Sequence, residues 1–189
     1  GGAEPAAVAG HSLGEYSALV AAGVIDFRAS LPLVRARAQA MQDAVPEGTG
    51  GIAAILGLED EAIRGVCKDA AQGEVLEAAN YNAPGQVVIA GNRSAVERGM
   101  ALAKERGAKR AVMLPMSAPS HCSLMTPSAK TIAERLAQAN LQAPRLTFIN
   151  NVDVATPGEP EAIRDSLIRQ LSSPVRWVEI VQSMTARGV

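Results

Sequence analysis

Apolar residues along the chain recur with two spacings, one typical of helices and one typical of short strands. Within residues 26–45 they fall at Leu31, Val34, Ala38 and Met41, which lie on one face of a helix. Short apolar runs that end in Gly, Pro or Asn indicate strands instead. The predicted strands span residues 6–9, 52–57, 75–82, 86–90, 109–116 and 146–152. The predicted helices span residues 15–22, 26–45, 59–71, 94–106, 122–140, 161–171 and 178–186. This alternation predicts an α/β fold.

The middle of the chain has its own pattern, between the breaks at Pro46 and Pro119. Its elements follow in the order β-α-β-β-α-β, which is typical of a split βαβ or ferredoxin-like unit. Ser94 and Glu97 have the spacing of a capping box at the start of its second helix. We therefore expect a ferredoxin-like subdomain over residues 48–117, inserted into a discontinuous α/β domain made of residues 1–47 and 118–189.

Composition narrows the class of partner and the compartment. The 189 residues carry 18 Lys and Arg against 19 Asp and Glu, so the net charge is −1, and aromatic residues make up only 3%. Nucleic acids and anionic membranes attract proteins with a basic excess, so we expect neither as a partner. No apolar run reaches the ~18 residues of a membrane-spanning helix.

Cysteine and histidine are too scarce for a disulfide framework or a metal cluster. The chain has two cysteines, Cys67 and Cys122, and two histidines without any metal-binding spacing. We expect no metal site, and the low cysteine content favours a reducing cytoplasm.

Residues 10–14, Gly-His-Ser-Leu-Gly, match the pattern Gly-x-Ser-x-Gly. An apolar strand precedes them and a helix follows, which is the context of a sharp turn that holds a serine hydroxyl clear of the backbone. The free N–H groups at the start of that helix suit a developing oxyanion. Ser12 is therefore the candidate nucleophile. The alternative is a Gly-Ser turn in which Ser12 only caps the helix.

A serine nucleophile needs a base, and the chain offers only two histidines. His11 adjoins Ser12 in the tight turn, so its side chain is expected to point elsewhere. His121 stands just before a predicted helix, beside the predicted subdomain boundary, and is the candidate base; the alternative is a structural histidine. Cys122 is the rival nucleophile, but its apolar surroundings favour a buried, inert thiol.

The sequence leaves open which group orients the histidine. Asp153 and Asp165 both follow His121, and nothing in their spacing selects either one. A backbone carbonyl can also accept a hydrogen bond from the imidazole, which would make the site a Ser-His dyad.

Several segments together carry a resemblance to a known family. They are Gly-His-Ser-Leu-Gly-Glu-Tyr-Ser-Ala-Leu-Val at residues 10–20, Asn-Tyr-Asn-Ala-Pro-Gly-Gln-Val-Val-Ile-Ala-Gly at 80–91, Ser-His-Cys at 120–122, Asn-Asn-Val-Asp at 150–153, Arg-Gln-Leu at 169–171 and Pro-Val at 174–175. In combination they resemble the malonyl-CoA:acyl-carrier-protein transacylases, such as the stand-alone bacterial enzymes of fatty acid synthesis. The resemblance covers essentially the whole chain. It implies an α/β-hydrolase-like core with a ferredoxin-like insertion, in agreement with the predicted layout.

The resemblance implies roles for four catalytic positions. Ser12 matches the nucleophile and His121 the general base. The backbone N–H of Leu13 matches one oxyanion donor. Gln170 matches the residue whose backbone carbonyl orients the histidine.

The resemblance also implies a substrate site. Arg37 matches the arginine that binds the malonyl carboxylate, and His11 and Met41 are implied as further substrate-binding residues. Helical spacing alone does not select Arg37. It places Arg37 beside the apolar face and Arg35 on the opposite flank, and either could be a solvated or ion-paired surface residue.

The implied activity is transfer of a malonyl group from coenzyme A to acyl carrier protein through an acyl-serine, without a cofactor of its own. Both substrates are the expected partners. Carrier proteins of this type are acidic, so the basic residues Arg106, Lys109 and Arg110 are candidates for docking; the alternative is a solvated corner.

Two other functions share part of this pattern. A serine hydrolase or thioesterase would use Ser12 and His121 but would not need Arg37. An inactive piece that only docks carrier protein is the second alternative. The family's Gly-Gln-Gly segment and its final Gly-rich strand and helix have no counterpart here, so we expect the chain to be the central part of a longer enzyme.

Overall fold

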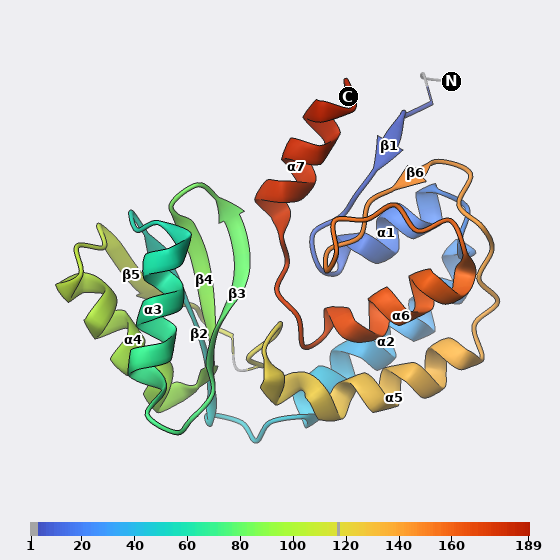
Figure 1. Cartoon of the computed structure of the whole chain (residues 1–189). Helices are drawn as coiled ribbons and strands as arrows, with labels where there is room; N and C mark the ends of the chain where they lie inside the picture. Colours follow the sequence, from blue (N-terminus) through green and yellow to red (C-terminus); the bar gives the residue numbers. More distant parts are fainter. Residues whose placement is uncertain (1–3, 117) are drawn as a thin grey trace.

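A computed structural model describes residues 4–116 and 118–189 as a mixed α/β structure with one parallel and one antiparallel sheet (Figure 1). The strands are β1 (Ala7–Val8), β2 (Gly50–Leu56), β3 (Leu76–Ala83), β4 (Gln86–Asn92), β5 (Arg110–Met113) and β6 (Thr147–Phe148). The helices are α1 (Gly14–Ala21), α2 (Phe27–Asp43), α3 (Asp60–Ala71), α4 (Arg93–Glu105), the 3₁₀ turn η1 (Ser123–Met125), α5 (Thr126–Ala137), α6 (Pro160–Gln170) and α7 (Trp177–Ala186). The prediction of an α/β fold is thus confirmed.

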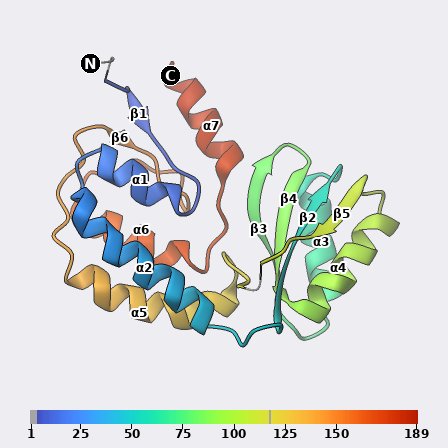
Figure 2. The same cartoon turned by 180° about the vertical axis from the view of Figure 1, so that it is seen from behind.

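The first part of the structure is a helical layer around the short parallel pair of β1 and β6. Helix α2 packs against α5, and α5 packs against α6 (Figure 2). Their apolar faces form one core, whose largest fully buried side chains include Tyr16, Leu19, Ile132 and Phe148. Because β1 belongs to this core, the turn that follows it is held on a rigid support.

The second part is a four-stranded antiparallel sheet in the order β3-β4-β2-β5. Alternate residues of its strands, such as Ile55 and Ile89, form a core with the apolar faces of α3 and α4, which cover one side of the sheet. The opposite set, including Ile52 and Val88, packs against Cys122. The segment that carries His121 therefore lies against the face of the sheet that α3 and α4 leave open.

Two pairs of hydrogen bonds also join the helical part to the four-stranded sheet. The backbone N–H of Tyr81 in β3 donates to the carbonyl of Val175 at 2.9 Å, and the N–H of Val175 donates to the carbonyl of Ala79 at 2.9 Å. Glu77 of β3 accepts from the N–H and the hydroxyl of Ser123, at 3.1 and 2.5 Å. Both views place β3 on the side of the sheet next to α7 (Figures 1 and 2).

Most predicted elements are confirmed within a few residues, and the differences have local causes. The capping box is wrong: α4 begins at Arg93, and the Ser94 hydroxyl donates to Glu74 at 2.7 Å. The helix predicted over residues 122–140 divides into η1 and α5, with Pro127 in the first turn of α5. The predicted strand over 146–152 is ordered as a strand only at Thr147–Phe148, where β1 pairs with it. The predicted subdomain boundary falls at residue 117, outside the described residues.

Candidate active site

Ser12 occupies the sharp turn between β1 and α1. Its φ of 52° is in the left-handed region, which a non-glycine residue adopts only under local constraint. A Cβ on Gly10 would lie 1.9 Å from the carbonyl oxygen of Gly14, so the turn requires glycine there. A Cβ on Gly14 would meet nothing within 4 Å, so the second glycine of the motif is not needed for packing.

Asn151 holds this turn from the other side. Its Oδ1 accepts from the Ser12 N–H at 2.7 Å, and its Nδ2 donates to the Gly10 carbonyl at 2.8 Å. Both ends of the turn are therefore bound to one buried amide. The strain at Ser12 is offset by contacts from a residue more than a hundred positions away.

His121 meets the serine directly. Its Nε2 lies 2.7 Å from Ser12 Oγ, and its Nδ1 lies 2.9 Å from the backbone carbonyl oxygen of Gln170. A carbonyl only accepts, so Nδ1 carries the proton and Nε2 is free to accept from the Ser12 hydroxyl. His121 also has a positive φ, 63°, and its N–H donates to the Leu171 carbonyl at 3.0 Å.

The environment keeps this histidine neutral. Burial lowers the pKa of His121 to about 4; the hydrogen bond to the Gln170 carbonyl opposes the shift, and the positive charge of Arg37 adds to it. A neutral imidazole at physiological pH can take a proton from the serine.

Neither aspartate contacts the histidine. Asp153 accepts from both Arg169 Nη atoms at 2.9 and 2.7 Å, and Asp165 accepts from Arg169 Nε at 2.7 Å. Of the alternatives that the sequence left open, the structure has the backbone carbonyl beside the ring. Cys122 is buried, donates to the Pro119 carbonyl at 3.0 Å, and has its pKa raised to about 12 by burial. Its thiol is therefore poorly suited to attack.

Arg37 reaches the same serine from α2. Its Nη2 donates to Ser12 Oγ at 3.0 Å and to Gln170 Oε1 at 2.9 Å, and its guanidinium carbon lies 5.8 Å from the centre of the Tyr16 ring. The side chain is 5% exposed, and Nε has no partner among the described residues. Burial lowers the pKa of Arg37 from its ordinary value, but an arginine keeps its charge in proteins. Arg35, by contrast, is exposed.

Glu15 and Asn151 contact this site, yet the sequence reasoning assigned them no role. Glu15 follows the motif on α1 and is fully buried, with Oε2 accepting from Gln170 Nε2 at 2.6 Å. Burial raises its pKa to about 8. The available signal was a charged residue in an otherwise apolar helix, since such a residue is buried only with partners.

Leu13, His11 and Met41 are the other residues predicted for the catalytic and substrate site. Leu13 is at the start of α1, where backbone N–H groups have no acceptor inside the helix, and its side chain is half exposed. His11 points away from Ser12, as expected: its Nε2 lies 2.8 Å from Asn82 Oδ1, and its ring packs edge-on against Trp177. Met41 is buried in the helical core.

The candidate docking residues lie between the end of α4 and the start of β5. Arg106 forms an ion pair with Asp69. Arg110 begins β5, the edge strand opposite β3. Since Ala111 faces α3 and α4, Arg110 projects from the open face of the sheet, as does Val112. Lys109 is exposed. The structure does not bring these three residues to Ser12.

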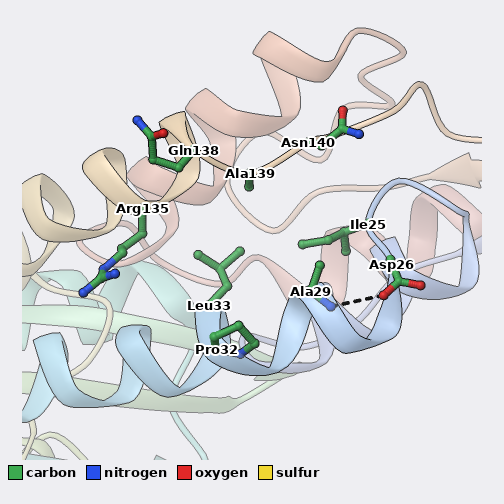
Figure 3. A pocket seen from close by; sticks show the side chains of 9 residues that line it. All are labelled: Ile25, Asp26, Ala29, Pro32, Leu33, Arg135, Gln138, Ala139 and Asn140. Carbon is green, nitrogen blue, oxygen red and sulfur yellow. Dashed lines mark hydrogen bonds between the residues drawn. The ribbon is translucent and has the colours of Figure 1, made fainter.

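A surface hollow of about 520 Å³ lies between the start of α2 and the end of α5 (Figure 3). It is lined by Ile25, Asp26, Ala29, Pro32, Leu33, Arg135, Gln138, Ala139 and Asn140. None of the catalytic candidates lines it, so it is not the candidate site. In residues 4–116 and 118–189 we find no cluster of three or more His, Cys, Asp or Glu able to hold a metal ion. None of the helices described is long and apolar enough to span a membrane.

Comparison with known proteins agrees with the motifs. The family model described as "Acyl transferase domain" matches residues 1–189. The malonyl CoA-acyl carrier protein transacylase of Escherichia coli K12 is 55% identical over 189 residues, which is 100% of this chain and 61% of that protein. The chain thus spans about three fifths of the length of this curated relative.

Solved structures of similar proteins superpose closely on this chain. The acyl-carrier-protein S-malonyltransferase of Burkholderia pseudomallei 1710b is 57% identical and superposes with a TM-score of 0.98, covering 100% of this chain and 62% of that one. A malonyl-transacylase solved in complex with its type II PKS acyl-carrier protein is 52% identical, with a TM-score of 0.99, covering 100% of this chain and 61% of that one.

Proposed function

Since the chain belongs to the acyl transferase domain family, we propose that it carries the catalytic centre of a malonyl-CoA:acyl-carrier-protein transacylase. The observation that carries the proposal is the pair of contacts at one atom. Ser12 Oγ has the base His121 at 2.7 Å on one side and the Arg37 guanidinium at 3.0 Å on another. A nucleophile, a base and a cation for an acidic acyl group thus meet within hydrogen-bond distance.

In the first half-reaction Ser12 Oγ attacks the malonyl thioester carbonyl, and its proton passes to His121 Nε2. The Gln170 carbonyl stabilises the imidazolium through Nδ1–H. The Leu13 N–H, at the start of α1, stabilises the oxyanion of the tetrahedral intermediate. The C–S bond then breaks, and the coenzyme A sulfur leaves with the proton that His121 returns. The product is a malonyl ester of Ser12.

The second half-reaction is the reverse with a different thiol. The phosphopantetheine thiol of acyl carrier protein gives its proton to His121 and attacks the ester, and Ser12 recovers its proton as the C–O bond breaks. Arg37 binds the distal malonyl carboxylate, a contact that a neutral acyl group cannot make. The carrier protein seen with a 52% identical malonyl-transacylase supports the choice of acceptor. No cofactor takes part in these steps.

The decisive test is mass spectrometry of the chain after mixing with malonyl-CoA. The expected result is one malonyl adduct, absent from Ser12→Ala and retained in Cys122→Ser. The adduct should persist in buffer and disappear when holo carrier protein is added. An adduct that still forms in Ser12→Ala would show that another residue is the nucleophile. An adduct that water removes as fast as the thiol does would favour a serine hydrolase instead. A chain that binds carrier protein without acylation would favour a docking piece.

The proposal extends to the architecture. Residues 1–47 and 118–189 form an α/β-hydrolase-like core, and residues 48–117 form a ferredoxin-like insertion. The sheet order β3-β4-β2-β5, with α3 and α4 on one face, supports the second assignment. The separate apolar cores of the two parts support the division. The fatty acid pathway and the cytoplasm are the proposed setting, in keeping with the named activity of the relatives.

A further inference from the structure

The side-chain amide of Gln170 is completely buried and has partners on both of its ends. Its Oε1 accepts from Arg37 Nη2 at 2.9 Å. Its Nε2 donates to the Ser12 carbonyl at 2.9 Å and to Glu15 Oε2 at 2.6 Å. All three contacts depend on which way the amide faces.

A reversed amide would turn NH₂ hydrogens toward the Arg37 guanidinium, which has only donors, and would turn its oxygen toward the Ser12 carbonyl, which only accepts. The Ser12 carbonyl belongs to the backbone and cannot be exchanged. Glu15 is the side chain that supplies the second acceptor. Removing it would leave a buried donor of Gln170 unpaired and would loosen the amide from its observed position.

Glu15 is itself held in place. It is fully buried on α1, and its Oε2 is the carboxyl oxygen that contacts Gln170. Burial raises the pKa of Glu15 to about 8, so the group accepts from Gln170 near neutral pH while largely uncharged. None of the ion pairs among the described residues includes Arg37. The buried Arg37 guanidinium therefore has no anionic partner among the described residues, and an incoming carboxylate can pair with it.

We infer that Glu15 is a positioning residue for acyl-group selection: it pairs the second N–H of the Gln170 amide and so fixes that amide in place, and the amide holds Arg37 against Ser12 and directs its charge to the carboxylate of the incoming acyl group. This inference rests on the proposed function and assigns Glu15 no contact with substrate. The orientation of His121 is independent of it, because His121 uses the backbone carbonyl of Gln170.

The test compares acylation of the chain by malonyl-CoA and by acetyl-CoA in five variants. Glu15→Met keeps the length of the side chain and removes the acceptor, so malonyl acylation should fall about tenfold while acetyl acylation stays within about twofold. Glu15→Gln restores an acceptor and should recover the parental ratio. Gln170→Met should lose the same selectivity as Glu15→Met, and the double variant should lose no more than either one. Glu161→Met, at an exposed glutamate, is the matched control and should change nothing.

Equal losses of malonyl and acetyl acylation in Glu15→Met, or additive losses in the double variant, would overturn the inference. If Glu15→Met does not fold, Gln170→Met provides the kinetic test, because it removes the same Glu15–Gln170 hydrogen bond from the side of Gln170. A parental malonyl-to-acetyl ratio in Gln170→Met would then overturn it.

An NMR measurement decides the matter even if the parent chain is not acylated, an outcome that would refute the proposed function separately. The side-chain NH₂ resonances of Gln170, assigned by their loss in Gln170→Met, should be protected from solvent exchange and should shift in Glu15→Met more than in Glu15→Gln. Unprotected resonances, or resonances that no change at Glu15 moves, would overturn the inference.

Discussion

At the scale of single residues, the site depends on a buried histidine that stays uncharged. A base acts in its neutral form, and burial lowers the pKa of His121 to about 4, so the neutral form dominates above that pH. We expect the single-turnover acylation rate to stay nearly constant from pH 7 down to about pH 5 and to fall below pH 5. Rapid-quench mass spectrometry measures this, with circular dichroism at each pH to confirm folding. A rate that halves near pH 6.5, the value of an exposed histidine, would contradict the assignment.

The second prediction at this scale concerns Arg37. The proposed charge-assisted contact to the malonyl carboxylate would contribute about 1.5–3 kcal/mol, so Arg37→Ala should lower malonyl acylation by roughly one to two orders of magnitude. Acetyl acylation should hold steady or rise, because a neutral acyl group no longer leaves the buried charge unpaired. Lys at this position should recover little, since it lacks the planar fork. Competition between the two thioesters gives the ratio directly.

Arg35→Ala is the matched control for that experiment. Arg35 lies two residues away on the exposed side of α2 and should leave the ratio unchanged. If Arg37→Ala instead depressed both reactions equally, Arg37 would be structural, and the dicarboxylic substrate would lose its main physical support.

At the scale of elements, the turn between β1 and α1 treats its two glycines differently. Gly10→Ala would place a Cβ 1.9 Å from the Gly14 carbonyl oxygen, so the turn cannot form without moving backbone. We expect a loss of at least about 3 kcal/mol in the free energy of unfolding. Gly14→Ala has open space and a helical position, so its stability should stay within about 1 kcal/mol of the parent.

Urea unfolding of the two glycine variants measures the difference. Similar destabilisation by both would show that the turn is not the strained element described here. The pattern Gly-x-Ser-x-Gly has glycine at both ends. Only at the first, Gly10, does the backbone of Gly14 come too close for a Cβ.

At the scale of the whole molecule, the proposed docking of carrier protein would depend on how the two parts are arranged. Arg110 shares the open face of the sheet with the residues that pack on the His121 segment, whereas Arg106 is already paired with Asp69. We therefore expect Arg110→Gln to raise the KM for carrier protein severalfold and to leave the KM for malonyl-CoA unchanged. Arg106→Gln should raise the KM for carrier protein by less, because Arg106 is already paired with Asp69. Steady-state transfer assays with each substrate varied in turn measure this; equal effects on both substrates would argue against docking at β5.

Most elements of the fold were predictable because they depend on neighbours in sequence. The apolar spacing within residues 26–45 predicts α2, and the structure shows a cap at its start, with Asp26 Oδ1 accepting from the Arg28 N–H at 2.8 Å. The capping box at Ser94 was wrong because it depends on a contact with a residue distant in sequence. The Ser94 hydroxyl donates to the carboxylate of Glu74, which lies just before β3. The shortened β6 likewise reflects the length of its partner, β1, which no local pattern contains.

The same division holds at the candidate site. Ser12 and His121 were accessible to sequence reasoning because a local motif marks the first and the scarcity of histidine marks the second. By itself, however, the spacing of residues could not choose between Asp153, Asp165 and a carbonyl beside His121. Nor could it place Glu15 and Asn151 beneath the turn. The contacts of Asn151 and Glu15 join residues 139 to 155 positions apart, as in Ser12 with Asn151 and Glu15 with Gln170. Hydrogen bonds over such separations depend on how the elements pack in three dimensions, so only the tertiary structure could decide them.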